Sequence, residues 1–235
     1  MGKNMTKSFY IIDDHEMLRL GTCDWLANNS DWKCAGESGT HEKAFADFER
    51  MSLEKETDED TKNDEKSDEK TDRKSAYGAK GLPSILISDL NFYGENIGFD
   101  FIKKIHSLYP DVKIVVYSMF FAAGFVQGAV KNGASGYISK NASSTELLEC
   151  MEKVFAGEDF IQEELNMSLI KYNKLTDALT RREKEVMELL LRRCSNDQIA
   201  NQLNIKKRAV ENYISLIYEK TGVNDRDELV KRYGQ

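Results

Sequence analysis

Residues 8–14 read Ser-Phe-Tyr-Ile-Ile-Asp-Asp, a short apolar run that stops at two adjacent aspartates. An unbroken apolar run of this length is typical of a strand that is buried on both faces of a parallel sheet. The pattern recurs three times, at residues 84–88, 112–117 and 136–139. The polar residues at or after the ends of these later runs are Asp89, Ser118 and Lys140. We therefore predict parallel strands with polar side chains at their carboxyl ends.

Segments with helical periodicity separate these runs. They span Glu16–Asn28, His41–Arg50, Phe99–Tyr109, Ala122–Asn132 and Ser144–Ala156. Ser143 and Glu146 have the spacing of a capping box at the start of the last segment. Strands that alternate with helices predict a doubly wound α/β domain of the flavodoxin-like class, with its site outside the carboxyl ends of the strands.

Residues 52–80 do not follow this alternation. They are rich in Asp, Glu, Lys and Thr and contain almost no apolar side chains. Such a segment cannot bury enough apolar surface to offset the entropy of ordering it. We predict a charged, flexible insertion within the α/β domain. An EF-hand does not explain it, because Asn63 stands where the calcium loop requires glycine.

The last third of the chain has only helical patterns. An acidic amphipathic segment, helical around residues 163–172, connects to three short helices predicted at Arg181–Arg193, Asn196–Asn204 and Lys207–Thr221. Two further capping boxes support these starts, Thr180 with Glu183 and Ser195 with Gln198, and Gly222 suits the end of the third helix. We predict a small all-α domain after the α/β domain.

Length and composition agree with two soluble domains. The chain has 235 residues, of which 40% are hydrophobic, and no apolar run approaches the length of a membrane span. Its start lacks a signal-peptide pattern, so we expect a cytoplasmic protein with no membrane partner. Its four widely spaced cysteines offer no C-x-x-C pair, which disfavours a zinc site.

The net charge of −7 alone argues against a nucleic-acid partner. However, Lys and Arg slightly outnumber Asp and Glu from Asp177 to Gln235. This small surplus is no strong phosphate-binding signal, so a DNA-binding hypothesis has to depend on the residue pattern.

Three carboxylates, Asp13, Asp14 and Asp89, should converge where neighbouring strands end. They repel one another, and a hard cation with oxygen preference, most plausibly Mg²⁺, relieves that repulsion. Ser118 and Lys140 would complete a small anion pocket. A carboxylate in such a pocket can attack a phosphoryl group while the metal and the ammonium stabilise the transferring oxygens.

This set of residues resembles the receiver domain of two-component response regulators, over about residues 8–157. The resemblance implies that Asp89 is the phosphoacceptor and that Asp13, Asp14, Asp89 and Asn91 hold the metal, Asn91 through its backbone carbonyl. It also implies that Ser118 and Tyr137 are switch residues and that Lys140 contacts the phosphoryl group.

In the all-α part, two successive predicted helices have apolar faces that can pack together, which leaves the outer face of the last helix free. The segments 179–186, 195–203 and 210–217 resemble the LuxR-type helix-turn-helix. Arg, Asn and Glu side chains can read base edges, and basic side chains can contact phosphates. The candidate DNA-binding residues are Lys206, Lys207, Arg208, Glu211, Asn212, Ser215 and Lys220, with Arg182 and Arg193 as further phosphate contacts.

The two resemblances in this order are those of a NarL/FixJ-family response regulator. They imply a receiver domain at residues 1–157, a linker at 158–176 and a LuxR-type helix-turn-helix domain at 177–235. They further imply phosphorylation of Asp89 by a sensor histidine kinase, which controls homodimerisation and binding to double-stranded DNA. The implied protein regulates transcription and is not an enzyme.

Two alternatives remain open. The loop after Asp89 lacks the proline usual in the family and is one residue longer, which motivates a phosphorylation-independent DNA-binding regulator whose receiver serves for docking or dimerisation. A Mg²⁺-dependent phosphohydrolase is disfavoured, because its D-x-D pattern is absent from Asp13-Asp14-His15. Glu211 also departs from the basic residue usual at its position, so the DNA target cannot be transferred from the family.

Overall fold

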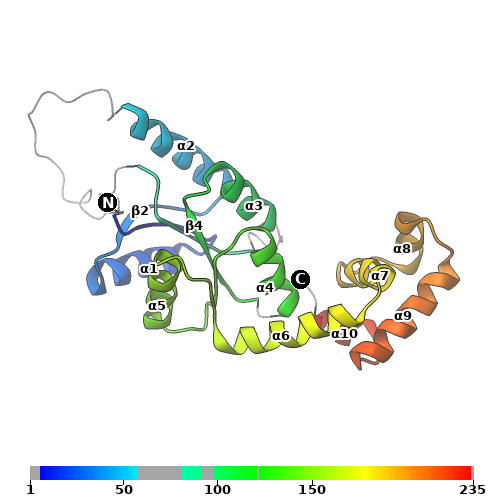
Figure 1. The fold of residues 1–235 in the computed structure, drawn as a ribbon. Helices are drawn as coiled ribbons and strands as arrows, with labels where there is room; N and C mark the ends of the chain where they lie inside the picture. Colours follow the sequence, from blue (N-terminus) through cyan, green and yellow to red (C-terminus); the bar gives the residue numbers. More distant parts are fainter. Residues whose placement is uncertain (1–5, 58–80, 92–97, 121, 234–235) are drawn as a thin grey trace, which may run out of the picture. The chain divides into compact units, whose positions relative to one another are not determined.

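The computed structural model describes residues 6–57, 81–91, 98–120 and 122–233, with residues 54–57 as backbone only. The N-terminal elements are β1 (Ser8–Ile12), α1 (Glu16–Asn29), β2 (Lys33–Ser38), α2 (His41–Thr57), β3 (Ile85–Ser88), α3 (Gly98–Leu108), β4 (Lys113–Ser118), α4 (Ala123–Lys131), β5 (Gly136–Ser139), α5 (Ser144–Phe155) and β6 (Phe160–Ile161). The C-terminal elements are α6 (Glu163–Ala178), α7 (Arg181–Leu191), α8 (Asn196–Leu203), α9 (Lys207–Thr221) and α10 (Arg226–Tyr233). Figure 1 shows their course along the chain.

The strands form one parallel sheet in the order β2-β1-β3-β4-β5-β6. This order confirms the predicted doubly wound α/β class, with β1 and β3 side by side in the interior of the sheet. Every residue of β1, β3 and β5 is buried. Because both faces of these strands are buried, their residues form the continuous apolar runs from which the strands were predicted.

The sheet is covered by helices on two faces. Buried side chains of α1 and α5 pack with alternate residues of the strands, including Phe9, Ile11, Ile87 and Val115, in one core. On the other face the ring of Tyr10 packs edge-on against Phe48 of α2. Figure 1 shows α2 and α3 on the side of the sheet opposite α1 and α5. Because both faces of β1, β3 and β5 are covered, these strands contain no charged residue, and the charged side chains Asp13, Asp89 and Lys140 follow their ends.

Several predicted boundaries need correction. Helix α2 continues through Thr57 instead of ending at Arg50, so the first residues of the predicted insertion, Ser52–Thr57, are helical. The remainder of that insertion, residues 58–80, lies outside the described residues. Strands β2 and β6 were not predicted. Strand β2 is a partly exposed edge strand with mixed polarity, and β6 has two residues, so neither has an apolar run.

The helices of the C-terminal part pack around their own core. Val186 and Leu190 of α7, Ile199 of α8 and Val210 and Ile217 of α9 are all buried in one cluster. All three predicted capping boxes are present, at α5, α7 and α8. Helix α9 ends at Gly222 in the left-handed conformation, as predicted. Helix α10, which the sequence analysis missed, adds Leu229 to this core.

The chain divides into two compact units. One comprises Met1–Met119 and Ala129–Ile161, and the other comprises Phe120–Gly128 and Gln162–Gln235, so the boundary runs through α4. Among the described residues, none of the helices combines the length and the apolar character that a membrane crossing requires.

Glu183 connects two helices of the second unit. Its carboxylate accepts the backbone N–H of Thr180 in the capping box of α7, and it accepts two hydrogen bonds from Lys220 Nζ of α9 at 2.9 and 2.7 Å. The residue is buried. The hydrogen bond from Lys220 lowers the pKa of Glu183, and the bonds from Thr180 lower it further against the opposing effect of burial. The ionised form of Glu183 therefore stabilises the folded domain.

We predict that Glu183→Gln lowers the free energy of unfolding by about 1–2 kcal/mol at pH 7, because glutamine keeps the capping bond but loses the charged bonds to Lys220. A carboxyl whose pKa is lowered on folding stabilises the folded state above its unfolded pKa of about 4.3, and this contribution disappears as the pH falls through the folded value. The difference from wild type should therefore shrink below pH 4 in urea titrations followed by circular dichroism.

The matched control is Glu185→Gln on the same helix. Its carboxylate pairs with Arg181 and Arg182 at the surface. Such exposed pairs contribute less than about 1 kcal/mol, so this variant should stay near wild type. A Glu183→Gln effect that stays the same from pH 7 to well below pH 4 would show that the charge on Glu183 is not what stabilises the domain.

Candidate functional site

The backbone of the sheet brings three of the predicted site residues to one edge. Asp13 follows β1 and donates its N–H to the carbonyl of Ser38 at 3.1 Å. Asp89 follows β3 and donates to the carbonyl of Ile12 at 3.0 Å, and Lys140 follows β5 and donates to the carbonyl of Ser118 at 2.9 Å. Each residue thus continues the hydrogen-bonding pattern of the sheet by one position. The parallel register is the reason that these side chains meet.

The Lys140 ammonium joins two carboxylates. Lys140 Nζ lies 2.5 Å from Asp13 Oδ2 and 2.6 Å from Asp89 Oδ2, and all three side chains are almost fully buried. Burial alone would lower the pKa of Lys140, but the hydrogen bonds to Asp13 and Asp89 and the two negative charges outweigh it and raise this pKa. Lys140 therefore stays a cation beside both carboxylates.

Two hydroxyl groups from β4 and β5 lie in the same region. Ser118 and Tyr137 are both fully buried. Burial raises the pKa of the Tyr137 phenol, the charge of Asp89 raises it further, and a hydrogen bond with Ser118 opposes the shift. Tyr137 thus remains a neutral hydroxyl that is coupled both to Ser118 and to the charge on Asp89.

The acidic side chains offer a donor set for a cation. Ligand atoms of Asp13, Asp14 and His15 lie within 4.8 Å of one another among the described residues. Asn91 Oδ1 is buried, and within the described part of the chain it has no hydrogen-bond partner. Carboxylate and amide oxygens suit Mg²⁺, which prefers oxygen ligands and keeps several waters. The residues present therefore fit Mg²⁺ at this edge.

The loop after Asp89 is closed by a contact that the sequence analysis did not predict. Asp89 Oδ1 accepts the N–H of Leu90 at 2.6 Å, and the carbonyl of Leu90 accepts the N–H of Gly98 at 3.1 Å. A Cβ atom at position 98 would lie 2.5 Å from Leu90 Cα and 2.7 Å from its carbonyl oxygen. Only glycine fits there, so Gly98 fixes where this loop ends. Residues 92–97 lie outside the described residues.

Sequence reasoning also missed Arg19. It is buried on α1, in line with the core residues Cys23 and Leu26. An arginine at i among apolar residues at i+4 and i+7 is a signal that could have been read from the sequence, because a buried arginine needs an acceptor. Its acceptors are the carbonyl of Asp13 and the carboxylate of Glu37.

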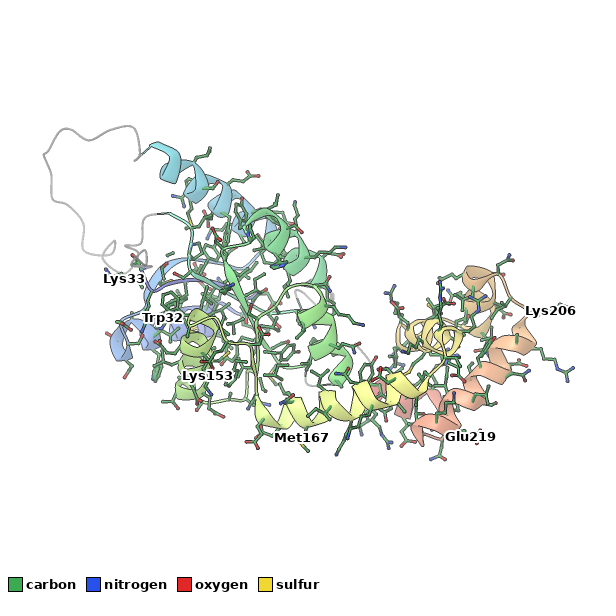
Figure 2. The ribbon with its side chains drawn as sticks, in the orientation of Figure 1. Trp32, Lys33, Lys153, Met167, Lys206 and Glu219 are labelled. Carbon is green, nitrogen blue, oxygen red and sulfur yellow. The ribbon has the colours of Figure 1, made fainter. Side chains whose placement is uncertain are left out.

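A second surface lies on α9. Val210 and Ile217 bury one side of this helix, while Arg208, Glu211 and Asn212 are exposed on the other. Lys206 and Ser215 are exposed as well. Asn204, in the left-handed conformation, ends α8 and turns the chain into α9. Figure 2 shows Lys206, which directly precedes α9, and Glu219, near the end of α9, extending outward.

Two lysines of the predicted DNA-binding set have partners within the domain. Lys207 Nζ lies 3.0 Å from Asp197 Oδ2, with both side chains more than half exposed. Such a surface pair is weak and easily exchanged for another anion. Lys220, in contrast, is committed to the buried carboxylate of Glu183 and donates to the carbonyl of Ala178. The two further candidates also have partners, since Arg182 donates to the carbonyl of Leu203 and Arg193 pairs with Asp227.

Comparisons with known proteins match both parts of the chain. Residues 177–233 match the family model of bacterial regulatory proteins of the luxR family. The transcriptional regulatory protein DegU of Brevibacillus brevis is 28% identical over 94% of this chain and 89% of its own length. The transcriptional regulatory protein DesR of Bacillus subtilis (strain 168) is 34% identical, over 65% of this chain and 74% of its own length.

Solved structures share the fold at lower identity. RcsB from Salmonella enterica serovar Typhimurium, bound to the promoter P1flhDC in the presence of the phosphomimetic BeF3-, aligns over 97% of this chain and 98% of its own, with a TM-score of 0.65 and 19% identity. Three findings point to the same family: the relatives, the luxR-family match at the C-terminus and the polar edge of the parallel sheet. The chain belongs to the response regulators of the NarL/FixJ type.

Proposed function

We propose that this protein is a cytoplasmic switch in which a sensor histidine kinase phosphorylates Asp89 and thereby controls homodimerisation and sequence-specific binding to double-stranded DNA. The receiver would span residues 1–157, the linker 158–176 and the helix-turn-helix domain 177–235. The observation that carries this proposal is the Lys140 ammonium between the carboxylates of Asp13 and Asp89, beside the hydroxyl groups of Ser118 and Tyr137.

The arrangement supports phosphoryl transfer to Asp89. A carboxylate oxygen of Asp89 attacks the phosphorus atom, the bond from phosphorus to the phosphohistidine nitrogen breaks, and that nitrogen keeps the electron pair and takes up a proton. Bound Mg²⁺, held by Asp13, Asp14, Asp89 and the backbone carbonyl of Asn91, would neutralise charge on the transferring oxygens. Lys140 already contacts Asp89 and supplies a second positive charge without reorganisation.

Phosphorylation would change what Ser118 and Tyr137 contact. An acyl phosphate on Asp89 would add oxygen acceptors and charge near the buried hydroxyl of Tyr137, which already senses the charge of Asp89 and is hydrogen-bonded to Ser118. Ser118 would turn toward the new acceptor, and Tyr137 would follow through its hydrogen bond with Ser118. A switch of this kind works only if the phosphoryl group favours one of two pre-existing states.

The output surface would be the exposed side of α9. In the major groove, Arg208 can read guanine, Asn212 can read adenine and Glu211 can accept from cytosine. Lys206, Lys207 and Ser215 can contact phosphates beside them. We do not retain Lys220 as a phosphate contact, because its bonds to Glu183 connect α9 to α7. A homodimer would place two such helices one DNA turn apart.

We predict that the wild type gains one phosphoryl group when incubated with Mg²⁺ and acetyl phosphate, and that Asp89→Asn gains none, because the amide cannot act as the nucleophile. Intact-protein mass spectrometry checks this. Asp100→Asn, an exposed carboxylate on α3, is the matched control and should behave as wild type. If no variant is modified while a known receiver is, the phosphorylation-independent DNA-binding regulator becomes the better hypothesis.

We predict that Gly98→Ala slows phosphorylation of Asp89 about tenfold or more, because the new methyl group would displace the Leu90 backbone next to the nucleophile. The rate follows from quenched-flow samples analysed by mass. Gly21→Ala on α1 is the control, since nothing lies within 4 Å of its added Cβ. Equal rates for Gly98→Ala and wild type would show that the loop tolerates displacement at Leu90.

We predict that Asn212→Ala weakens binding to duplexes selected by the wild type from a random library by about 1–3 kcal/mol, with little effect on unselected DNA, because Asn212 contacts base edges. Lys206→Ala should weaken binding to both DNAs and lower the salt slope by about 1. Fluorescence anisotropy at several salt concentrations measures both effects.

The control for these DNA-binding variants is Lys231→Ala on α10, a basic residue that is exposed but lies outside α9. It should change neither affinity nor salt slope. Equal losses for Asn212→Ala on selected and unselected DNA would contradict a role of Asn212 in base recognition.

A further inference from the structure

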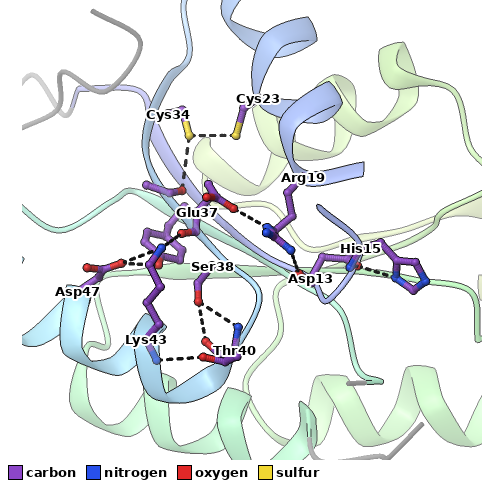
Figure 3. A network of polar contacts seen from close by, with 12 residues as sticks. Asp13, His15, Arg19, Cys23, Cys34, Glu37, Ser38, Thr40, Lys43 and Asp47 are labelled. Atoms are coloured by element: carbon purple, nitrogen blue, oxygen red, sulfur yellow. Dashed lines mark hydrogen bonds and ion pairs between the residues drawn. The ribbon is translucent and has the colours of Figure 1, made fainter. Parts of the chain in front are cut away.

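We propose that Arg19 is a positioning residue for the acidic pair: its guanidinium, anchored by Glu37, fixes the backbone of Asp13 and so sets the Mg²⁺ affinity of the site. This inference rests on the proposed function, because it concerns the cation that phosphoryl transfer to Asp89 requires. Figure 3 shows Arg19 between Glu37 and Asp13, with dashed lines that mark its contacts to both.

Arg19 contacts strand β2 and the residue that follows β1. It lies on α1, donates from one terminal nitrogen to the backbone carbonyl of Asp13, and donates from Nε to the carboxylate of Glu37 on β2. Its side chain is 11% exposed and that of Glu37 is 22% exposed. A buried guanidinium is tolerated only when its charge is paired and its donors have acceptors. Glu37 supplies the opposing negative charge at Nε, so a terminal nitrogen of the Arg19 guanidinium can donate to the carbonyl of Asp13.

Asp13 is held at every polar atom. Its N–H donates to Ser38, its carbonyl accepts from Arg19, Oδ1 accepts the N–H of His15 at 2.9 Å, and Oδ2 pairs with Lys140. The carbonyl belongs to the peptide group that joins Asp13 to Asp14. Fixing that carbonyl therefore fixes the plane from which the second carboxylate projects.

Arg19 has little freedom to move away from this position. A Cβ atom at Gly39, just after β2, would lie 3.1 Å from a terminal nitrogen of Arg19 and 3.5 Å from its Cζ. The guanidinium thus packs directly on the backbone of Gly39. Residues that orient metal ligands from behind commonly change metal affinity 10- to 100-fold when they are substituted.

Charge and position predict opposite effects for Arg19. A positive charge near a cation site opposes cation binding, so a purely electrostatic role predicts that loss of this charge tightens Mg²⁺ binding. A positioning role predicts weaker binding even when the charge is kept. The experiment therefore uses variants that leave the net charge unchanged.

The test compares Mg²⁺ dissociation constants of full-length variants, obtained by displacement of Mn²⁺ followed by electron paramagnetic resonance. Arg19→Lys keeps the charge but not the fork geometry, and should bind Mg²⁺ about tenfold more weakly. The double variant Arg19→Gln/Glu37→Gln removes both charges and should weaken binding similarly. Gly39→Ala moves the guanidinium by a few tenths of an ångström and should give a smaller loss, about twofold to fivefold.

The matched control is Lys43→Arg, which exchanges the two basic side chains as Arg19→Lys does and keeps the net charge. Lys43 belongs to the same network, donates to the carbonyl of Glu37 and pairs with Asp47, and does not contact Asp13. The Mg²⁺ affinity of this control variant should stay within about twofold of the wild-type affinity, at a change in melting temperature comparable to that of Arg19→Lys. A merely structural role of the network would give the same Mg²⁺ affinity for Arg19→Lys and Lys43→Arg.

The outcomes separate the two proposals. Unchanged or tighter Mg²⁺ binding by Arg19→Lys and by the double variant would overturn the positioning role of Arg19. The proposed function would stand in that case, because the wild type still binds Mg²⁺. Failure of the wild type to bind either cation would instead remove the proposed function, and this inference with it. If Arg19→Lys does not fold, Gly39→Ala decides, because it alters neither a charge nor a hydrogen-bonding group.

Discussion

The ion pairs of Lys140 with Asp13 and Asp89 are the constraint on which the polar end of this sheet depends. Burying two carboxylates away from water is costly without a partner charge, and Lys140 supplies this charge from a third strand end. The pairing requires β1, β3 and β5 to end at the same edge, which the continuous parallel register ensures. Loss of any one charge would leave another buried and uncompensated.

The site contains rigid residues, which these ion pairs and hydrogen bonds hold in place, and adjustable residues near the surface. Asp13 is fixed by its backbone and side-chain bonds, whereas Asp14 and His15 reach the surface with 16% and 71% of their side chains exposed. The buried members hold the geometry, and the exposed members can exchange partners with solvent or a cation. A phosphoryl group at Asp89 would therefore meet a preorganised ammonium and adjustable ligands, which suits repeated addition and removal.

The sequence predicted the features that depend on local pattern. The buried strands have unbroken apolar runs, and the capping boxes at Ser143, Thr180 and Ser195 have a fixed spacing, so all of these were found. The edge strand β2 was missed because only one strand pairs with it and its residues are of mixed polarity. The role of Gly98 could not be predicted, because it comes from a contact with Leu90 that only the tertiary fold creates. The spacing of Arg19 from Cys23 and Leu26 could have indicated that it is buried, but not that its partners are Glu37 and Asp13.

The charge distribution supports the proposal that the output acts as a homodimer. Helix α9 presents Lys206, Lys207 and Arg208 near its start but also Glu211 and Glu219, on a chain of net charge −7. Phosphate contacts supply most of the affinity for DNA, and each basic residue adds only one such contact. On the proposed mechanism a single domain would bind DNA weakly, whereas two linked domains would add their contacts and share one loss of translational freedom. On the proposed mechanism, control of dimerisation is for this reason also control of DNA affinity.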